Sequence, residues 1–203
     1  MKIETLELRG LPGGIKSYMQ DKVVSDYILR YKDKDPILDA PAASMVFAES
    51  CRFQGLTIRN YKSTTAAITL HSVWNATLRD IKLMQCKTPA GLAITSDKAE
   101  DNADPRTNDV ALDQLQIEAT AGPAVTVDNA VLVNVYGGKY HGSDFNSRRP
   151  TDYTGPLWRI HNSIVIFHGP VLAKCDHPPI EITGRRSRVL GTCYCQSGTP
   201  TAV

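Results

Sequence analysis

The sequence predicts an all-β fold in which the chain winds through stacked coils. Three observations lead to this prediction: a short apolar motif recurs along the chain, a second strand-like motif follows it, and no repeat contains a helical stretch. Both motifs alternate apolar and polar residues with a period of two and favour β-branched side chains, which is typical of strands. Repeats of about 20–50 residues indicate a solenoid.

The first motif is a triplet with an apolar residue at each end and any residue between them. Its copies are Met45–Phe47, Ile68–Leu70, Leu92–Ile94, Val125–Val127, Trp158–Ile160 and Ile180–Ile182. If the last residue of each copy is taken as its anchor, successive anchors lie 23, 24, 33, 33 and 22 residues apart. The short steps correspond to one coil. The two long steps predict polar insertions at 95–109 and 137–154, which leave the scaffold at its turns.

The second motif has apolar residues at its first, fourth and sixth positions. Its copies are Phe53–Ile58, Leu78–Leu83 and Leu112–Ile117, with a looser copy at Leu132–Gly137. A leucine-rich repeat begins in a similar way, but it needs Asn or Cys at the position that holds Tyr61, Cys86, Thr120 and Tyr140 here. Only one of these fits, and the rest of each repeat is β-branched. The sequence therefore predicts a short parallel β-helix of about six coils over residues 41–195.

The coil motifs also resemble a known group of proteins. The stretch GLTIRNYKSTTAAITLHSVWNATLRDIKLMQC at residues 55–86 in particular resembles the pectate-lyase-like superfamily of right-handed parallel β-helices, and most of all the tail spikes of bacteriophages. The resemblance covers roughly residues 41–195. It implies a right-handed coil, a homotrimer with coils packed around a threefold axis, and a place in the virion.

The two ends of the solenoid differ in sequence. Apolar residues at steps of three and four predict an amphipathic helix over residues 15–31, which would cap the exposed edge of the first coil. With a strand expected from Met1 to Arg9, this helix makes an N-terminal unit at 1–40. Residues 196–203 form a polar tail. Because the last coil has no recognisable cap, we expect it to pair with another subunit or the chain to continue.

Composition excludes several classes of partner. The 23 Lys and Arg residues nearly balance 21 Asp and Glu residues, for a formal charge of +2, so neither nucleic acid nor an anionic membrane is expected as a partner. No apolar run reaches the length of about eighteen residues that membrane insertion needs. Five scattered cysteines without CxxC spacing argue against a disulfide framework and a zinc site. No metal or cofactor is expected.

One pair of candidate catalytic residues comes from the coil alignment. The residue after the anchor is Asp128 in one coil and His161 in the next, so the two are expected on neighbouring strands. A carboxylate beside an imidazole suits general acid–base chemistry. The alternative is a structural ladder of polar side chains along the turn. Asn129 and Asn162, at the next position, favour that ladder.

The insertion at 137–154 supplies the other candidates. Its predicted ligand-binding residues are Tyr140, His141, Phe145, Arg148, Arg149 and Tyr153. Aromatic faces can stack on sugar rings, and guanidinium groups bind carboxylates and hydroxyls. Asp144 and Asp152 add two acid–base candidates. Alternatively, the insertion packs on a neighbouring subunit, because Tyr, Phe and Arg are equally favoured in protein interfaces.

The leading hypothesis is a tail-spike-type domain of a phage virion that binds a bacterial surface polysaccharide during host attachment. Its expected partners are that polysaccharide, two further copies of the chain and other tail proteins, and its expected location is the virion or otherwise the extracellular space. Two alternatives stay open. One is a polysaccharide depolymerase, either a hydrolase or a lyase. The other is a structural segment that trimerises a longer spike or fibre.

Overall fold

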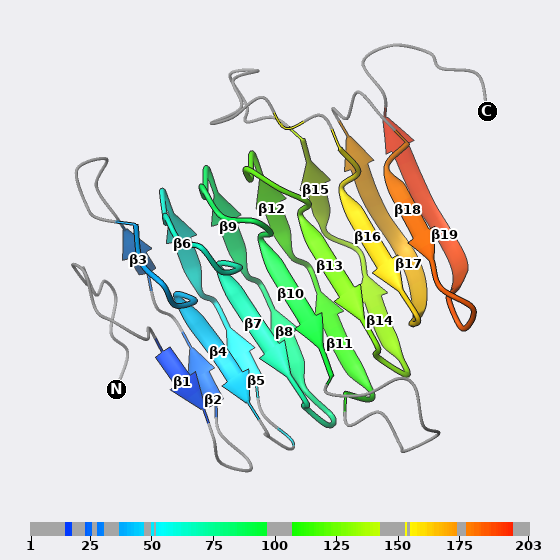
Figure 1. Ribbon diagram of the computed structural model, residues 1–203, viewed down its shortest axis with the longest axis horizontal. Coiled ribbons are helices and arrows are strands. Elements are labelled where there is room, and N and C mark those ends of the chain that lie inside the picture. Colours follow the sequence, from blue (N-terminus) through cyan, green and yellow to red (C-terminus); the bar gives the residue numbers. More distant parts are fainter. Residues whose placement is uncertain are drawn as a thin grey trace.

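The computed structural model describes residues 15–17, 23–25, 28–30, 37–46, 50, 52–96, 107–142, 153, 155–173 and 178–196 of the chain. Within these residues the regular structure is entirely β, and every strand pair is parallel. The strands form two sheets, which we call sheet A and sheet B. Figure 1 shows successive coils stacked along the long axis, from the blue N-terminal strands to the red C-terminal strands.

Sheet A has seven strands, one from each coil. They are β1 (Ile15–Ser17), β4 (Ala43–Val46), β7 (Ile68–His71), β10 (Leu92–Thr95), β13 (Val125–Asp128), β16 (Trp158–His161) and β18 (Ile180–Thr183). Neighbours in this order are hydrogen-bonded. The seven strands exceed the six copies of the triplet seen in the sequence, because β1 adds a coil at the N-terminal end.

Sheet B has twelve strands. Most of them form two rows, which we call the two legs of the sheet, and the rows are joined through β17. The first leg contains β2 (Val23–Ser25), β5 (Arg52–Gln54), β8 (Thr77–Arg79), β11 (Val110–Asp113) and β14 (Val133–Tyr136). The second contains β3 (Ile28–Arg30), β6 (Thr57–Arg59), β9 (Lys82–Met84), β12 (Gln116–Glu118) and β15 (Lys139–His141). The longer strands β17 (Ile164–Ala173) and β19 (Arg188–Gln196) span both legs. Each coil therefore contributes one strand to sheet A and passes through both legs of sheet B.

The predicted N-terminal capping helix is wrong where the structure describes the segment. Within residues 15–31 the described elements are β1, β2 and β3, and they pair with the next coil. Val24 pairs with Phe53 and Leu29 with Ile58, so Val24-x-x-Tyr27-x-Leu29 is another copy of the second motif. Its first two apolar residues lie three apart, a spacing shared with a helix, and this overlap explains the wrong prediction. The predicted strand at residues 1–9 lies outside the described residues.

Strand register corrects the predicted alignment at two places. Met45 pairs with Leu70, so Met45, rather than Phe47, is the first anchor and the first step is 25 residues. In the fifth coil Val135 pairs with Leu112 and Tyr140 with Ile117. The motif there is Val135-x-x-Gly138-x-Tyr140, three residues later than predicted. This shift moves Tyr140 from the insertion into the scaffold.

The core consists of columns of like side chains, one from each coil. The sheet A column contains Met45, Leu70, Ile94, Val127 and Ile160, all with at most 1% of their surface exposed. Burying each such side chain contributes about 1.5–3 kcal/mol before entropy is counted. The next member, Ile182, is 50% exposed, because among the described residues no later coil covers it.

Residues with positive φ turn the chain at the corners between strands. One such corner holds Gly55, Asp80, Gln114, Gly137 and Gly169, with φ values of 67°, 52°, 54°, 57° and 72°. The backbone N–H of Asp80 donates to the carbonyl of Asp113 at 3.0 Å, and that of Gln114 to Tyr136 at 2.9 Å. Hydrogen bonding between coils thus continues through the corner and compensates the cost of a left-handed conformation at non-glycine residues.

An aromatic cluster fills the core of the later coils. The ring of Trp158 lies edge-on to Tyr140 and to Phe167, with centroid distances of 5.0 Å in both pairs. Tyr140 is fully buried, and this burial raises the pKa of its hydroxyl well above the ordinary value. The Tyr140 hydroxyl oxygen has no hydrogen-bond partner. The ring therefore stabilises the fold by packing, whereas its hydroxyl does not.

We predict that Tyr140→Phe leaves the free energy of unfolding unchanged or raises it by up to about 1 kcal/mol, because it removes a buried unpaired polar group. Tyr140→Ala should lower that free energy by about 3–5 kcal/mol, because it leaves a cavity. Urea denaturation followed by circular dichroism measures both. A loss of more than about 1 kcal/mol in the Phe variant would show that the hydroxyl makes a stabilising bond.

Candidate functional site

The outer face of sheet A carries polar side chains in two parallel columns. Because side chains alternate between the core and the surface, the middle residue of each triplet points outward. The first column is Ser44, Thr69, Ala93, Thr126, Arg159 and Glu181, and the second is His71, Thr95, Asp128, His161 and Thr183. The early coils contribute small side chains and hydroxyls, and the later coils contribute charges.

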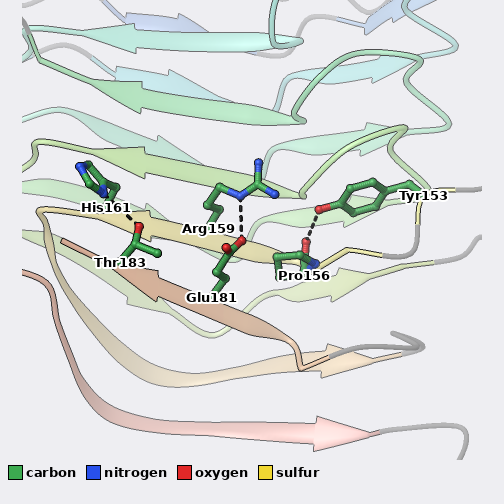
Figure 2. Close-up of polar contacts among 6 residues, drawn as sticks. All are labelled: Tyr153, Pro156, Arg159, His161, Glu181 and Thr183. Carbon is green, nitrogen blue, oxygen red and sulfur yellow. Dashed lines mark hydrogen bonds and ion pairs between the residues drawn. The ribbon is translucent and has the colours of Figure 1, made fainter.

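The charged end of this face is held by contacts between β16 and β18, which Figure 2 shows. The Arg159 Nε donates to Glu181 Oε2 at 2.9 Å, and the two side chains are 50% and 45% exposed. An ion pair this exposed adds at most about 1 kcal/mol to stability. Because about half of each side chain is exposed, both groups are accessible to a ligand that approaches the face.

His161 is fixed by two neighbours. Its Nδ1 lies 2.9 Å from Thr183 Oγ1, and its Nε2 lies 3.0 Å from Asn162 Nδ2. With the amide nitrogen of Asn162 as donor, Nε2 accepts, and the Nδ1–H group donates a hydrogen bond to the Thr183 hydroxyl oxygen. Three coils earlier in the same column, His71 Nδ1 makes the equivalent 2.9 Å contact with Thr95 Oγ1. The His–Thr bond thus occurs twice along the column, which supports the structural-ladder interpretation.

Asp128 lies beside His161, as the coil alignment predicts. The two residues are direct partners on β13 and β16. The Asp128 Oδ1 is buried and has no hydrogen-bond partner, and the same is true of the neighbouring Asn129 Oδ1. An unpaired buried acceptor lowers stability, so these two oxygens are a local cost to the fold. The Asp128 side chain as a whole is half-buried, which places a carboxylate at the edge of the face.

The predicted ligand-binding residues that the structure describes do not lie together. Tyr140 is in the core and cannot stack on a sugar, which corrects that prediction. The Tyr153 hydroxyl donates to the carbonyl of Pro156 at 3.0 Å, and Figure 2 places Tyr153 at the opposite end of the face from His161. His141 ends β15 in sheet B, beside Glu118. Asp144, Phe145, Arg148, Arg149 and Asp152 lie outside the described residues.

Arg159 and Glu181 were not predicted from the sequence, although a signal for them was present. Each is the middle residue of a triplet, and the register makes them direct partners. A column built from the middle positions, as well as from the positions after the anchors, would have placed both on the outer face next to His161. For these strands, the prediction used only the residues that follow the anchors.

A second exposed feature lies on the first leg of sheet B. The rings of Tyr136 and His168 stack with centroids 4.6 Å apart and an interplanar angle of 8°. Tyr136 is 42% exposed, and His168 Nε2 lies 3.4 Å from Asn134 Oδ1. In the two preceding coils of the same column, Arg79 Nε lies 3.4 Å from Asp113 Oδ2. Residues on this surface of sheet B can serve as controls for substitutions on the outer face of sheet A.

Comparison with known proteins bears on the fold. No protein-family model matches the chain, and no curated protein matches its sequence. Among solved structures the chain is similar to WceF of Pantoea stewartii, described as a glycan biofilm modifying enzyme with a bacteriophage tailspike-like parallel β-helix fold. The TM-score is 0.55 at 12% sequence identity.

The fold is a tailspike-like parallel β-helix. The similarity covers 96% of this chain but only 31% of the Pantoea protein, so the chain spans about a third of that protein's length. At this level of identity the comparison establishes architecture alone. In the part of the chain that is described, no helix is long and apolar enough to cross a membrane, and no group of three potential metal ligands gathers.

Proposed function

We propose that this chain is a tail-spike-type virion domain that binds a bacterial surface polysaccharide during host attachment, and that the outer face of sheet A is its binding surface. The observation that carries the proposal is the group Asp128, Arg159, His161 and Glu181, which lies on three neighbouring strands of one exposed face. The described action of the Pantoea protein on a glycan supports the ligand class.

The arrangement suits a polysaccharide for three physical reasons. Arg159 and Glu181 present a donor and an acceptor within one ion pair, and sugar hydroxyls can bond to both. Asp128, half-buried on the same face, adds a second carboxylate acceptor. Coils repeat every ~4.8 Å, so the face presents its side chains at regular intervals to a polymer that also repeats. The loop residues Phe145, Arg148 and Arg149 stay part of the proposal as further contacts.

We predict that Arg159→Gln weakens polysaccharide binding about ten-fold, because it removes a charge-assisted hydrogen-bond donor. Arg79→Gln is the matched control, because Arg79 is 53% exposed and also lies near a carboxylate, but on sheet B. The assay is an array of purified capsular polysaccharides and lipopolysaccharides. Equal binding by wild type and Arg159→Gln, with loss in Arg79→Gln or Tyr136→Ala, would move the site to sheet B.

The first alternative is a polysaccharide depolymerase, and the adjacency of Asp128 and His161 favours it. Under the binding proposal, incubation with a bound polysaccharide should release no reducing ends above the buffer value. Release by the wild type that falls about 100-fold or more in Asp128→Asn and His161→Gln would replace the binding proposal with a hydrolase or lyase. Asp80→Asn, at a corner of sheet B, is the control for the charge change.

The second alternative is a structural trimerising segment, favoured by the exposed last coil. Ile182 and Tyr194 are 50% and 68% exposed there. Both this alternative and the host-attachment proposal include a homotrimer, so we expect light scattering to give a mass near three times 22.3 kDa. A stable monomer would contradict the trimer. A trimer that binds none of the arrayed glycans would favour the structural alternative over the binding proposal.

A further inference from the structure

Two thiols lie side by side on the last strand of the solenoid. Cys193 and Cys195 are both on β19, and their Sγ atoms are 3.8 Å apart. Neither residue is in a disulfide. The expectation of no metal site rested on the absence of CxxC spacing. On a strand, however, side chains two residues apart point to the same side, so the spacing Cys-x-Cys brings the two sulfurs together.

Both thiols can be reached from solvent at the open end of the stack. The β17 partner of Cys195 is Leu172, which is fully buried, so Cys195 lies on the core side of β19. Cys195 is nevertheless exposed and Cys193 is only partly buried, because among the described residues no later coil covers β19. Cys86, the other cysteine that the structure describes, is fully buried in the core. The pair is therefore accessible to a ligand, whereas Cys86 is not.

The geometry of the pair favours a chelated metal ion over a disulfide. A disulfide needs sulfurs about 2.05 Å apart and Cα atoms usually no more than about 6.8 Å apart. Two residues along a strand separate the Cα atoms by about 6.6–6.8 Å, so a disulfide here would form only at the limit of that range. Two metal–thiolate bonds of about 2.3 Å at a tetrahedral angle place their sulfurs about 3.8 Å apart. This is the distance between the two Sγ atoms in the structure.

The protonation of Cys193 points in the same direction. Burial, with a smaller contribution from the adjacent Cys195 thiol, raises the pKa of the Cys193 thiol to about 11. Disulfide exchange requires a thiolate that is already present, and a thiol with this pKa supplies little of it at neutral pH. A metal ion instead displaces the thiol proton as it binds. Thiolates select soft metal ions, whereas Mg²⁺ and Ca²⁺ prefer oxygen ligands.

We propose that Cys193 and Cys195 chelate one soft metal ion at the open end of the β-helix. Both sulfurs bind as thiolates, and the two thiol protons pass to solvent. Among the described residues no third ligand joins them, so the remaining coordination positions are open to water. The bound ion holds the end of β19 in one conformation. The site goes beyond the proposed polysaccharide function and does not depend on it.

The test is a titration of the reduced protein with Cd²⁺, followed by the ultraviolet charge-transfer absorption of cadmium–thiolate bonds. The double variant Cys193→Ser/Cys195→Ser should bind one equivalent of Cd²⁺ less than the wild type. Each single variant should weaken binding at this site about 100-fold or more, because a chelate then loses one of its two bonds. Excess Mg²⁺ should not compete. Cys51→Ser, which removes one thiol and leaves the pair, is the matched control and should bind like wild type.

The melting temperature gives a second, independent measurement, because a ligand that binds only the folded chain raises it. Cd²⁺ should raise the melting temperature of the wild type and of Cys51→Ser. It should leave the melting temperature of the double variant unchanged. Circular dichroism of each variant without metal shows whether it is folded, so a loss of binding is assigned to the thiols only in a folded variant.

Three results would overturn the inference. Equal Cd²⁺ uptake by the wild type and the double variant would show that the ion binds elsewhere. Undiminished binding in either single variant would show that one thiol is enough and that no chelate forms. If peptide mapping of the purified protein shows Cys193 joined to Cys195, the pair is a disulfide and the metal site is wrong. None of these results bears on polysaccharide binding, which the Arg159→Gln variant tests.

Discussion

The register between coils is the constraint on which the rest of this structure depends. Every strand is parallel to its neighbours and is hydrogen-bonded to the equivalent residue of the next coil, so each side chain stands on its counterpart. A slip of one residue would exchange core and surface side chains along a whole strand. Columns of buried apolar residues therefore fix the register, and the register in turn fixes where each polar residue lies. Left-handed corner residues allow this stacking to continue around each coil.

The same constraint makes the surface a set of columns that can vary independently of the core. In sheet A the triplets keep apolar ends, while their middle residues change from Ser44 and Thr69 to Arg159 and Glu181. Charges thus accumulate at the C-terminal end of one face without cost to packing. In sheet B the corresponding freedom places the exposed Lys82 and Lys139 on either side of Gln116. A rigid scaffold of this kind holds polar groups at intervals suited to a repeating polymer.

Much of this fold follows from the sequence alone, because the period-two alternation and the repeat length are visible in it. The adjacency of Asp128 and His161 followed from counting residues between anchors. The errors arose where a local pattern had two interpretations. Residues 15–31 fit a helical period as well as the second motif. In the fifth coil, the looser match that begins at Leu132 was chosen in place of the correct motif, Val135-x-x-Gly138-x-Tyr140. The environment of Glu118 could not be predicted, because its burial depends on the three-dimensional surroundings of an outward position. Arg159 and Glu181 were predictable but were overlooked.

The central claim is that a polysaccharide covers the outer face of sheet A, and carboxyl footprinting tests it most directly. A carbodiimide with an amine labels accessible carboxylates, and mass spectrometry measures the extent at each residue with and without bound polysaccharide. Glu181 and Asp80 have similar exposure, at 45% and 52% of their side chains, and lie on different sheets. The account predicts that polysaccharide protects Glu181 and leaves Asp80 unchanged. Labelling of Glu181 that is unaffected by a saturating polysaccharide would contradict it.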